Sequence, residues 1–202
     1  MEPKQLLEIL QVASRLKTTP RHCETAPGRS ESVADHSWRI ALMAMLLTPE
    51  FPEADMNKVL RMCLIHDLGE AFTGDIPTFD KTEADVQKED ILFDAWVETL
   101  PGETRAEFSS LLAEMNALET PEAKIYKALD KLEAVISQNE SDISTWLPLE
   151  YDLQLTYGAK NVAFSPFLKA LKEENNRVTR EKIRAAGKYP SPINCCLSAS
   201  PN

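Results

Sequence analysis

LIHDLGEAFTGDIP (residues 64–77) places a histidine and a carboxylate at the end of an apolar, helix-like stretch. His66 and Asp67 directly follow apolar residues, and two further acids, Glu70 and Asp75, come close behind. At helical spacing, His66, Asp67 and Glu70 project from one side of the helix. A carboxylate beside a buried histidine is costly unless it is paired or bound to a metal. Imidazole and carboxylate groups on one side of a helix therefore indicate a divalent-cation site.

The same residues also have purely structural interpretations. His66 alone is compatible with a core histidine whose ring is satisfied by a hydrogen bond, and the acids are compatible with a solvated cluster at a helix end. Asp75 lies in a turn shaped by Gly74 and Pro77, where aspartate commonly has a conformational role. The cation-site interpretation gains from a second histidine, His36, thirty residues before His66.

The segment 32–47 is predicted to be the buried central helix that carries His36. Ser30 or Ser32 can cap it, and it is apolar on all sides from Ile40 to Leu47. The residues that share one stripe of this helix are Val33, His36, Ile40, Met43 and Leu47. His36 is therefore predicted to point into the core.

Composition narrows the class of protein. A chain of 202 residues with 43% hydrophobic and 27% charged residues suits one globular domain. Its net charge of -10 argues against a nucleic-acid polymer as partner, because phosphate backbones require surfaces rich in Lys and Arg. We expect no signal peptide and no membrane span, and the four cysteines form no C-x-x-C motif, so a reducing cytoplasm is the expected location.

Apolar residues recur at helical spacing along most of the chain, and strong strand alternation is absent. The fold class is therefore predicted to be all-α. Helices are expected at about 4–16, 32–47, 56–72, 83–99, 103–118, 121–139 and 164–184, with a shorter one near 148–157. Residues 187–202, rich in Ser, Pro and Asn, are expected to be a disordered tail.

The predicted helix 121–139 carries a further acid, Asp130. Its apolar stripe consists of Ile125, Leu129, Leu132 and Ile136, and Asp130 does not share it. Periodicity alone therefore predicts that Asp130 is a solvated surface residue.

Three blocks in order resemble the HD-domain metal-dependent phosphohydrolases, and within them the small 5'-deoxynucleotidases. The blocks are RSESVADHSWR with His36, LIHDLGEAFTGDIP with His66 and Asp67, and EAKIYKALDKLEA with Asp130, and the resemblance extends over about residues 4–180. It implies a helical bundle of about six to eight helices in residues 1–186, built around one metal site. It also implies that the ligands of one divalent cation (Co, Mn, Fe, Zn or Mg) are His36, His66, Asp67 and Asp130, which overrides the surface interpretation of Asp130.

The resemblance also assigns roles around the cation. Glu70 and Asp75 become carboxylates that either bond to the cation's ligands and water or act in catalysis. Arg21 becomes the contact to the substrate phosphate, and Glu122 an acid near the nucleoside. Close relatives carry a tryptophan just after this arginine or a few residues later, and that tryptophan stacks near the sugar and helps to reject ribonucleotides. RHCETAPGR has no tryptophan, so selectivity for deoxyribose is left open and His22 is expected to occupy part of that space.

The function implied is removal of the 5'-phosphate from a (deoxy)ribonucleoside monophosphate, by a cytoplasmic homodimer. Two-metal HD enzymes need further histidines after the HD pair, and this chain has none after His66, which favours one metal. Hydrolysis of (p)ppGpp or of a nucleoside triphosphate remains an alternative, although Gly69 and Glu70 stand where (p)ppGpp hydrolases have adjacent Glu and Asp. A second alternative is that the protein is a non-catalytic nucleotide-binding module. The apolar segment ILFDAWVETL (91–100) is expected either to form the dimer interface or to pack on its own core.

Overall fold

The computed structural model describes residues 1–188, and the described part is a helical protein with one small hairpin. In chain order the elements are α1 (Pro3–Ser14), η1 (Arg15–Lys17), β1 (Pro20–Ala26), β2 (Arg29–Ser32), α2 (Val33–Leu46), η2 (Thr48–Glu50), α3 (Met56–Ile65), α4 (Glu70–Thr73), α5 (Glu83–Val97), α6 (Gly102–Ala117), α7 (Pro121–Glu140), η3 (Ile143–Thr145), α8 (Glu150–Thr156) and α9 (Pro166–Ala185). The all-α fold class is confirmed. The predicted tail lies, from residue 189 onward, outside the described residues.

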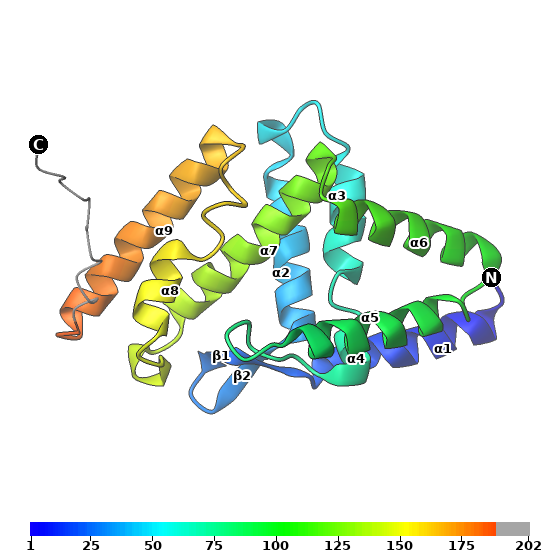
Figure 1. The fold of residues 1–202 in the computed structure, drawn as a ribbon, viewed down its shortest axis with the longest axis horizontal. Helices are drawn as coiled ribbons and strands as arrows, with labels where there is room; N and C mark the ends of the chain where they lie inside the picture. The colour runs from blue at the N-terminus through cyan, green and yellow to red at the C-terminus, as the bar shows by residue number, and fades with distance from the viewer. Residues whose placement is uncertain (189–202) are drawn as a thin grey trace, which may run out of the picture.

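Helices α2, α3 and α7 form the centre of the bundle (Figure 1). Helices α8 and α9 flank α7 on one side, and α5 and α6 lie on the other, while the hairpin is at the base of α2. The fully buried side chains where the central helices meet include Ile40, Met62, Ile125 and Leu129. This apolar contact holds rigid the three elements that carry the predicted cation ligands.

Local sequence signals set where the ligand-bearing helices begin. The Ser32 hydroxyl accepts a hydrogen bond from the Asp35 backbone N–H, and the Asp35 carboxylate accepts one from the Ser32 N–H, which makes a capping box. Helix α7 begins with Thr120 as its cap and Pro121 at its first position. Because α2 starts at Val33, His36 falls one turn into the helix and is completely buried, as predicted.

The hairpin β1–β2 was not expected from the sequence. Its strands are antiparallel, and Gly28 takes a φ of +74° at the turn, a conformation that glycine adopts readily. Its buried residues are Cys23, Glu31 and Ser32. Such a mainly polar hairpin has no alternation of apolar and polar residues, so periodicity could not reveal it.

The predicted helix 56–72 is two helices rather than one. Helix α3 ends at Ile65, and the backbone then turns tightly, because Leu68 N–H bonds to the Ile65 carbonyl and Glu70 N–H to the Asp67 carbonyl. The turn brings Gly69 against α5: a Cβ atom there would lie 2.9 Å from Cγ of Glu89. The HD pair therefore lies at a helix end and in a turn, not within a continuous helix.

Two interpretations based on periodicity are wrong. Asp130 is only 7% exposed, because α7 is covered by α2, α3 and α9 and not along its apolar stripe alone. Helix α2 is buried in its first turns, but Met45 and Leu46 near its end are 55% and 65% exposed. None of the helices in residues 1–188 is long and apolar enough to cross a membrane.

Candidate active site

The four predicted ligands converge at the centre of the bundle. His36 comes from α2, His66 and Asp67 from the end of α3 and the turn after it, and Asp130 from α7. His36 Nε2 lies 3.7 Å from Oδ2 of Asp67 and 3.5 Å from Oδ1 of Asp130. His66 Nε2 lies 3.0 Å from Oδ2 of Asp67 and 4.0 Å from Oδ1 of Asp130. The ligand atoms of His36, His66 and Asp67 thus lie within 4.8 Å of one another, and Oδ1 of Asp130 lies near both imidazoles.

The bonding of the two rings fits a cation at that point. His66 Nδ1 lies 2.9 Å from the Cys63 carbonyl oxygen, and His36 Nδ1 contacts the Glu133 carboxylate. Both Nε2 atoms are buried and have no hydrogen-bond partner among residues 1–188. With Nδ1 as the donor, each ring turns the lone pair of Nε2 toward the carboxylates, and this donor set suits a divalent cation.

The charges of the ligands also fit a cation. Burial opposes ionisation of Asp67, but the rings of His66 and His36 hold the pKa of its carboxyl well below the usual range. Burial opposes ionisation of Asp130 too, and Lys131 and Lys127 hold its pKa well below the usual range. Both carboxylates are therefore anionic at neutral pH.

His36 itself is basic. Burial and the charge of Arg21 favour the neutral ring, but the neighbouring carboxylates of Asp130 and Glu133 favour the protonated ring and raise the pKa of His36 to about 9. A cation bound at Nε2 must displace this proton.

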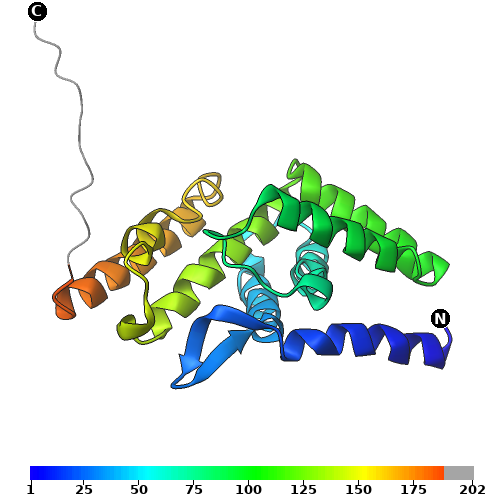
Figure 2. The ribbon, with the colours of Figure 1, turned by 60° about the horizontal axis from the view of Figure 1, so that its bottom comes forward.

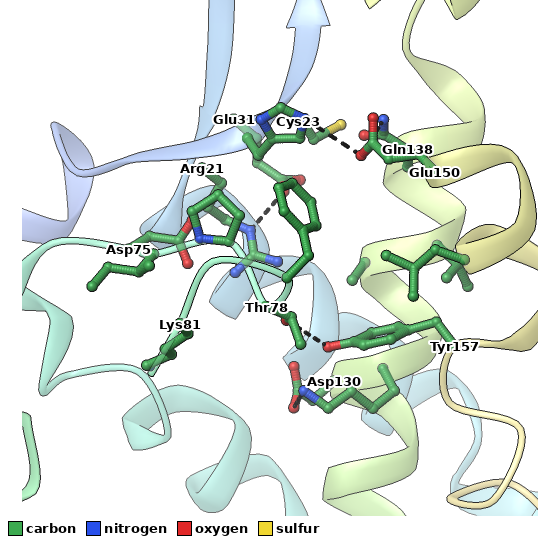
Figure 3. Close-up of a pocket in the computed structure, with 18 of the residues that line it drawn as sticks. Arg21, Cys23, Glu31, Asp75, Thr78, Lys81, Asp130, Gln138, Glu150 and Tyr157 are labelled. Carbon is green, nitrogen blue, oxygen red and sulfur yellow. Dashed lines mark hydrogen bonds and ion pairs between the residues drawn. The ribbon is translucent and has the colours of Figure 1, made fainter. Parts of the chain in front are cut away.

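A cavity of about 290 Å³ opens beside the site, and two of the predicted ligands, Asp67 and Asp130, line it (Figure 3). Although the whole chain is acidic, four cationic side chains line it: Arg21, Lys81, Lys127 and Lys131. Lys127 and Lys131 lie 2.9 and 3.3 Å from Oδ2 of Asp130, which leaves Oδ1 toward the histidines. The same cavity is also lined by six acids: Glu31, Asp67, Glu70, Asp75, Asp130 and Glu150. The four cationic side chains together with a bound divalent cation would offset this negative charge and so accept an anionic ligand such as a phosphate.

The hairpin places Arg21 in this cavity. Its Nε donates a hydrogen bond of 3.0 Å to Oε2 of Glu31 (Figure 3). Its Nη1 lies 3.7 Å from Oδ2 of Asp67. Burial opposes its charge, but Asp67 and Asp75 outweigh burial and raise the pKa of Arg21 further above its ordinary value. The guanidinium is therefore a permanent cation, oriented by Glu31.

Glu70 and Asp75, the two predicted catalytic acids, both line the cavity. Glu70 begins α4, and its Oε2 is buried without a hydrogen-bond partner in the described part of the chain. Burial, followed by the charges of Asp67 and Asp75, raises the pKa of Glu70 to about 10. Burial also raises the pKa of Asp75, and the charge of Arg21 partly offsets this. Glu70 therefore holds a proton at neutral pH while the cation is absent.

The opposite end of the cavity has aromatic and amide walls. His22 packs edge-on against Phe79 at a ring-centroid distance of 5.4 Å, and its Nε2 lies 3.4 Å from Oε1 of Glu150. Glu150 also accepts a hydrogen bond from the Gln138 amide. His22 thus lines the cavity together with Phe79, at the position where the related 5'-deoxynucleotidases were expected to carry a tryptophan.

Glu122 is the predicted site residue that the fold does not bring to the cavity. It lies in the first turn of α7, two turns before Asp130, and accepts a hydrogen bond of 2.8 Å from the Asp55 backbone N–H. Its contact is thus with the backbone before α3 and not with the cavity.

Sequence reasoning missed several residues of the site, chiefly the buried acids Glu31 and Glu133. Glu133 follows Asp130 by three residues, which is one helical turn, so the spacing of the acids in LDKLEA held a signal. Glu31 lies in the hairpin that was not predicted, and no sequence pattern indicated its role.

The HD domain family model matches residues 13–172. The chain belongs to the HD domain family. The 5'-deoxynucleotidase HDDC2 of Xenopus laevis is 30% identical over 190 residues, which cover 91% of this chain and 94% of that protein. The 5'-deoxynucleotidase HDDC2 of Dictyostelium discoideum is 34% identical over 148 residues, covering 66% and 76% of the two chains.

A solved structure has the same architecture as this HD domain. A predicted metal-dependent phosphohydrolase from Magnetospirillum magnetotacticum superimposes with a TM-score of 0.73 at 28% identity, over 92% of this chain and 97% of that one. Membership of the HD family agrees with the cation site inferred from the orphaned histidine nitrogens.

Proposed function

We propose that this HD domain is a metal-dependent phosphohydrolase that releases phosphate from nucleoside 5'-monophosphates. The observation that carries the proposal is the pair of buried, unpartnered histidine Nε2 atoms facing two carboxylates, at the edge of a cavity lined by four cationic side chains. The names of the similar 5'-deoxynucleotidases support the monophosphate as substrate.

A divalent cation held by His36, His66, Asp67 and Asp130 would supply Lewis acidity and lower the pKa of a water molecule toward neutrality. Arg21 binds two oxygens of the substrate phosphate through its planar guanidinium. Lys127 and Lys131 add positive charge on the α7 side of the same group. These residues orient phosphorus for in-line attack.

Two carboxyl groups divide the proton transfers. Asp75, on the loop that follows α4, positions the attacking water and takes its proton. Glu70 is the proton donor to the departing 5' oxygen, because it lines the cavity and its Oε2 has no hydrogen-bond partner in the described part of the chain. The described residues that line the cavity include no tryptophan, and His22 and Phe79 are proposed to bound the sugar, so both deoxyribose and ribose are proposed substrates.

A phosphate-release screen tests the proposal. Ribo- and deoxyribonucleoside 5'-monophosphates are assayed with Co²⁺, Mn²⁺, Fe²⁺, Zn²⁺ and Mg²⁺, with His66→Ala as the inactive control. Inorganic phosphate plus nucleoside supports the proposal. Pyrophosphate release from (p)ppGpp, or hydrolysis of triphosphates alone, contradicts it, and cation binding without any hydrolysis assigns a nucleotide-binding module instead.

We also propose that the protein is a cytoplasmic homodimer. Its two described cysteines, Cys23 and Cys63, are free, as expected in a reducing compartment. The segment 91–100 buries Phe93 and Val97 in the core, so it is not the favoured interface. Helix α1 buries none of its residues and runs along one edge of the molecule (Figure 2).

The apolar side chains exposed around α1 are Leu6, Leu7, Leu10, Trp38 and Leu64. They form a surface that a second copy can cover. Light scattering after gel filtration is expected to give twice the chain mass, and Leu7→Glu with Trp38→Glu should give monomers. A monomeric wild-type protein contradicts this part of the proposal.

A further inference from the structure

Glu133 is a completely buried acid with one close partner at the cation site. It lies on α7, one turn after Asp130, and both it and His36 are 0% exposed. One carboxylate oxygen, Oε2, contacts Nδ1 of His36. The other oxygen, Oε1, has no hydrogen-bond partner among residues 1–188, and its nearest charged contact is Nε of Arg39, at 3.7 Å.

Arg39 does not account for the position of Glu133. Its guanidinium is committed to Glu140, with Nη1 and Nη2 each donating a hydrogen bond of 2.5 Å to one carboxylate oxygen. Glu140 lies on the same helix as Glu133 but is 60% exposed. The shortest contact of Glu133 is therefore with His36, and a carboxylate oxygen of the buried Glu31 lies within 4.8 Å of both.

A buried carboxylate costs stability unless something compensates it, and an apolar side chain in the same place would be less costly. The closest compensating group is the imidazole of His36, while Arg39 at 3.7 Å and the charge of Arg21 act over longer distances, so the acid acts most directly on that ring. An imidazole held at Nδ1 has a fixed plane, and a proton on Nδ1 leaves the lone pair on Nε2. In His36, Nε2 is the atom that faces Asp67 and Asp130.

We propose that Glu133 is a positioning residue, which accepts a hydrogen bond from Nδ1–H of His36 and so aims Nε2 at the cation. Glu133 binds neither cation nor substrate. Its effect is on cation affinity, because it fixes the tautomer and direction of one ligand and makes the ring a stronger donor. The inference rests on the cation site of the proposed function but does not depend on the substrate.

The matched pair Glu133→Gln and Glu140→Gln tests this role, since both replace a glutamate on α7 by its neutral isostere. Titration of the metal-free proteins with Mn²⁺ is expected to give about 10- to 100-fold weaker binding for Glu133→Gln and wild-type binding for Glu140→Gln. Excess Mn²⁺ should restore kcat to Glu133→Gln, because Arg21, Glu70 and Asp75 are untouched. A folded Glu133→Gln protein with wild-type Mn²⁺ affinity, or a kcat that stays low in excess Mn²⁺, overturns the proposal.

A measurement on the wild-type protein covers the case in which Glu133→Gln does not fold. In the Zn²⁺-loaded protein, ¹⁵N spectra of the histidine rings are expected to show His36 with a hydrogen-bonded proton on Nδ1 and the metal on Nε2. A proton on Nε2 of His36, or no binding of Zn²⁺ or Mn²⁺ by the wild-type protein, overturns the proposal. Cation binding without phosphate release would contradict the proposed function and leave the role of Glu133 intact.

Discussion

Raising the pH from 6.5 to 8.5 is expected to strengthen cation binding about tenfold per pH unit, because one ligand must lose a proton first. Burial and Arg21 lower the proton affinity of His36, but Asp130 and Glu133 outweigh them and raise its pKa to about 9. The ring is therefore protonated over most of this range, and a cation competes with that proton for Nε2.

The size of the effect follows from the distance between the pH and this pKa. At pH 7 the pH lies two units below a pKa of about 9, so the cation binds about 100-fold more weakly than above pH 9, which corresponds to about 2.7 kcal/mol. Asp67 and Asp130 do not add to the pH dependence of cation affinity, because their pKa values are held well below the usual range and both stay ionised.

The stability of the cation-free protein should also depend on whether His36 is protonated. A pKa raised from 6.5 to about 9 means that protonated His36 stabilises the cation-free protein fully below pH 6.5, and that this stability is lost as the pH rises through 9. Glu70 acts in the same direction, because an acid whose pKa is raised to about 10 destabilises the fold increasingly as the pH rises above 4.5. The Tm difference between Mn²⁺-loaded and EDTA-treated protein should therefore widen from pH 6.5 to 8.5.

Calorimetric titration with Mn²⁺ at pH 6.5, 7.5 and 8.5 measures the slope directly. His22→Gln is the matched control: it removes a cavity histidine that is not a ligand, so its slope should equal that of the wild-type protein. An affinity that stays constant across these three pH values would refute the reasoning, because it would mean that no proton leaves His36 on binding.

Three further predictions concern single residues. Asp75→Asn should lower kcat by about 10²- to 10⁴-fold while Mn²⁺ affinity in the calorimeter stays within a few-fold, and full activity would exclude Asp75 as the base. Gly69→Ala should cost about 1–3 kcal/mol in a denaturant or thermal melt, since the new Cβ would lie 2.9 Å from Cγ of Glu89 and 3.4 Å from Cβ of Phe93; Gly102→Ala, where nothing lies within 4 Å, is the control and should not destabilise. Glu122→Gln should leave KM and kcat for a nucleoside monophosphate unchanged, because Glu122 bonds to the Asp55 N–H outside the cavity, and a tenfold rise in KM would return it to the substrate site.

Sequence reasoning was most accurate where a structural signal lies within a few residues. Helix α5 was expected at 83–99 and occupies Glu83–Val97, and α9 was expected at 164–184 and occupies Pro166–Ala185. Both begin at capping residues, Thr82 and Ser165, whose side chains accept from the first turn. The prediction failed at 66–69, where close packing of Gly69 on α5 accompanies a turn that apolar spacing alone does not encode.

The residues of the candidate site likewise fall into those that local sequence signals identify and those that they do not. Its histidines were identifiable because His36 shares an apolar stripe and His66 follows an apolar run. The neighbouring residues in the sequence therefore predict that each ring is buried. Asp130 was not identifiable by periodicity, and only the resemblance placed it among the ligands. Its burial depends on which helices cover α7, and that is decided by contacts between distant segments.

By itself, then, the sequence determined a helical fold, two inward histidines and a carboxylate beside one of them, because helical periodicity and capping act over three or four residues. Tertiary structure alone decided that Arg21 enters the cavity on a polar hairpin, that Glu122 stays outside it, and that Glu133 meets His36. The physical reason is that a polar side chain is buried or exposed according to the partners that distant segments bring to it, and no local pattern records those partners.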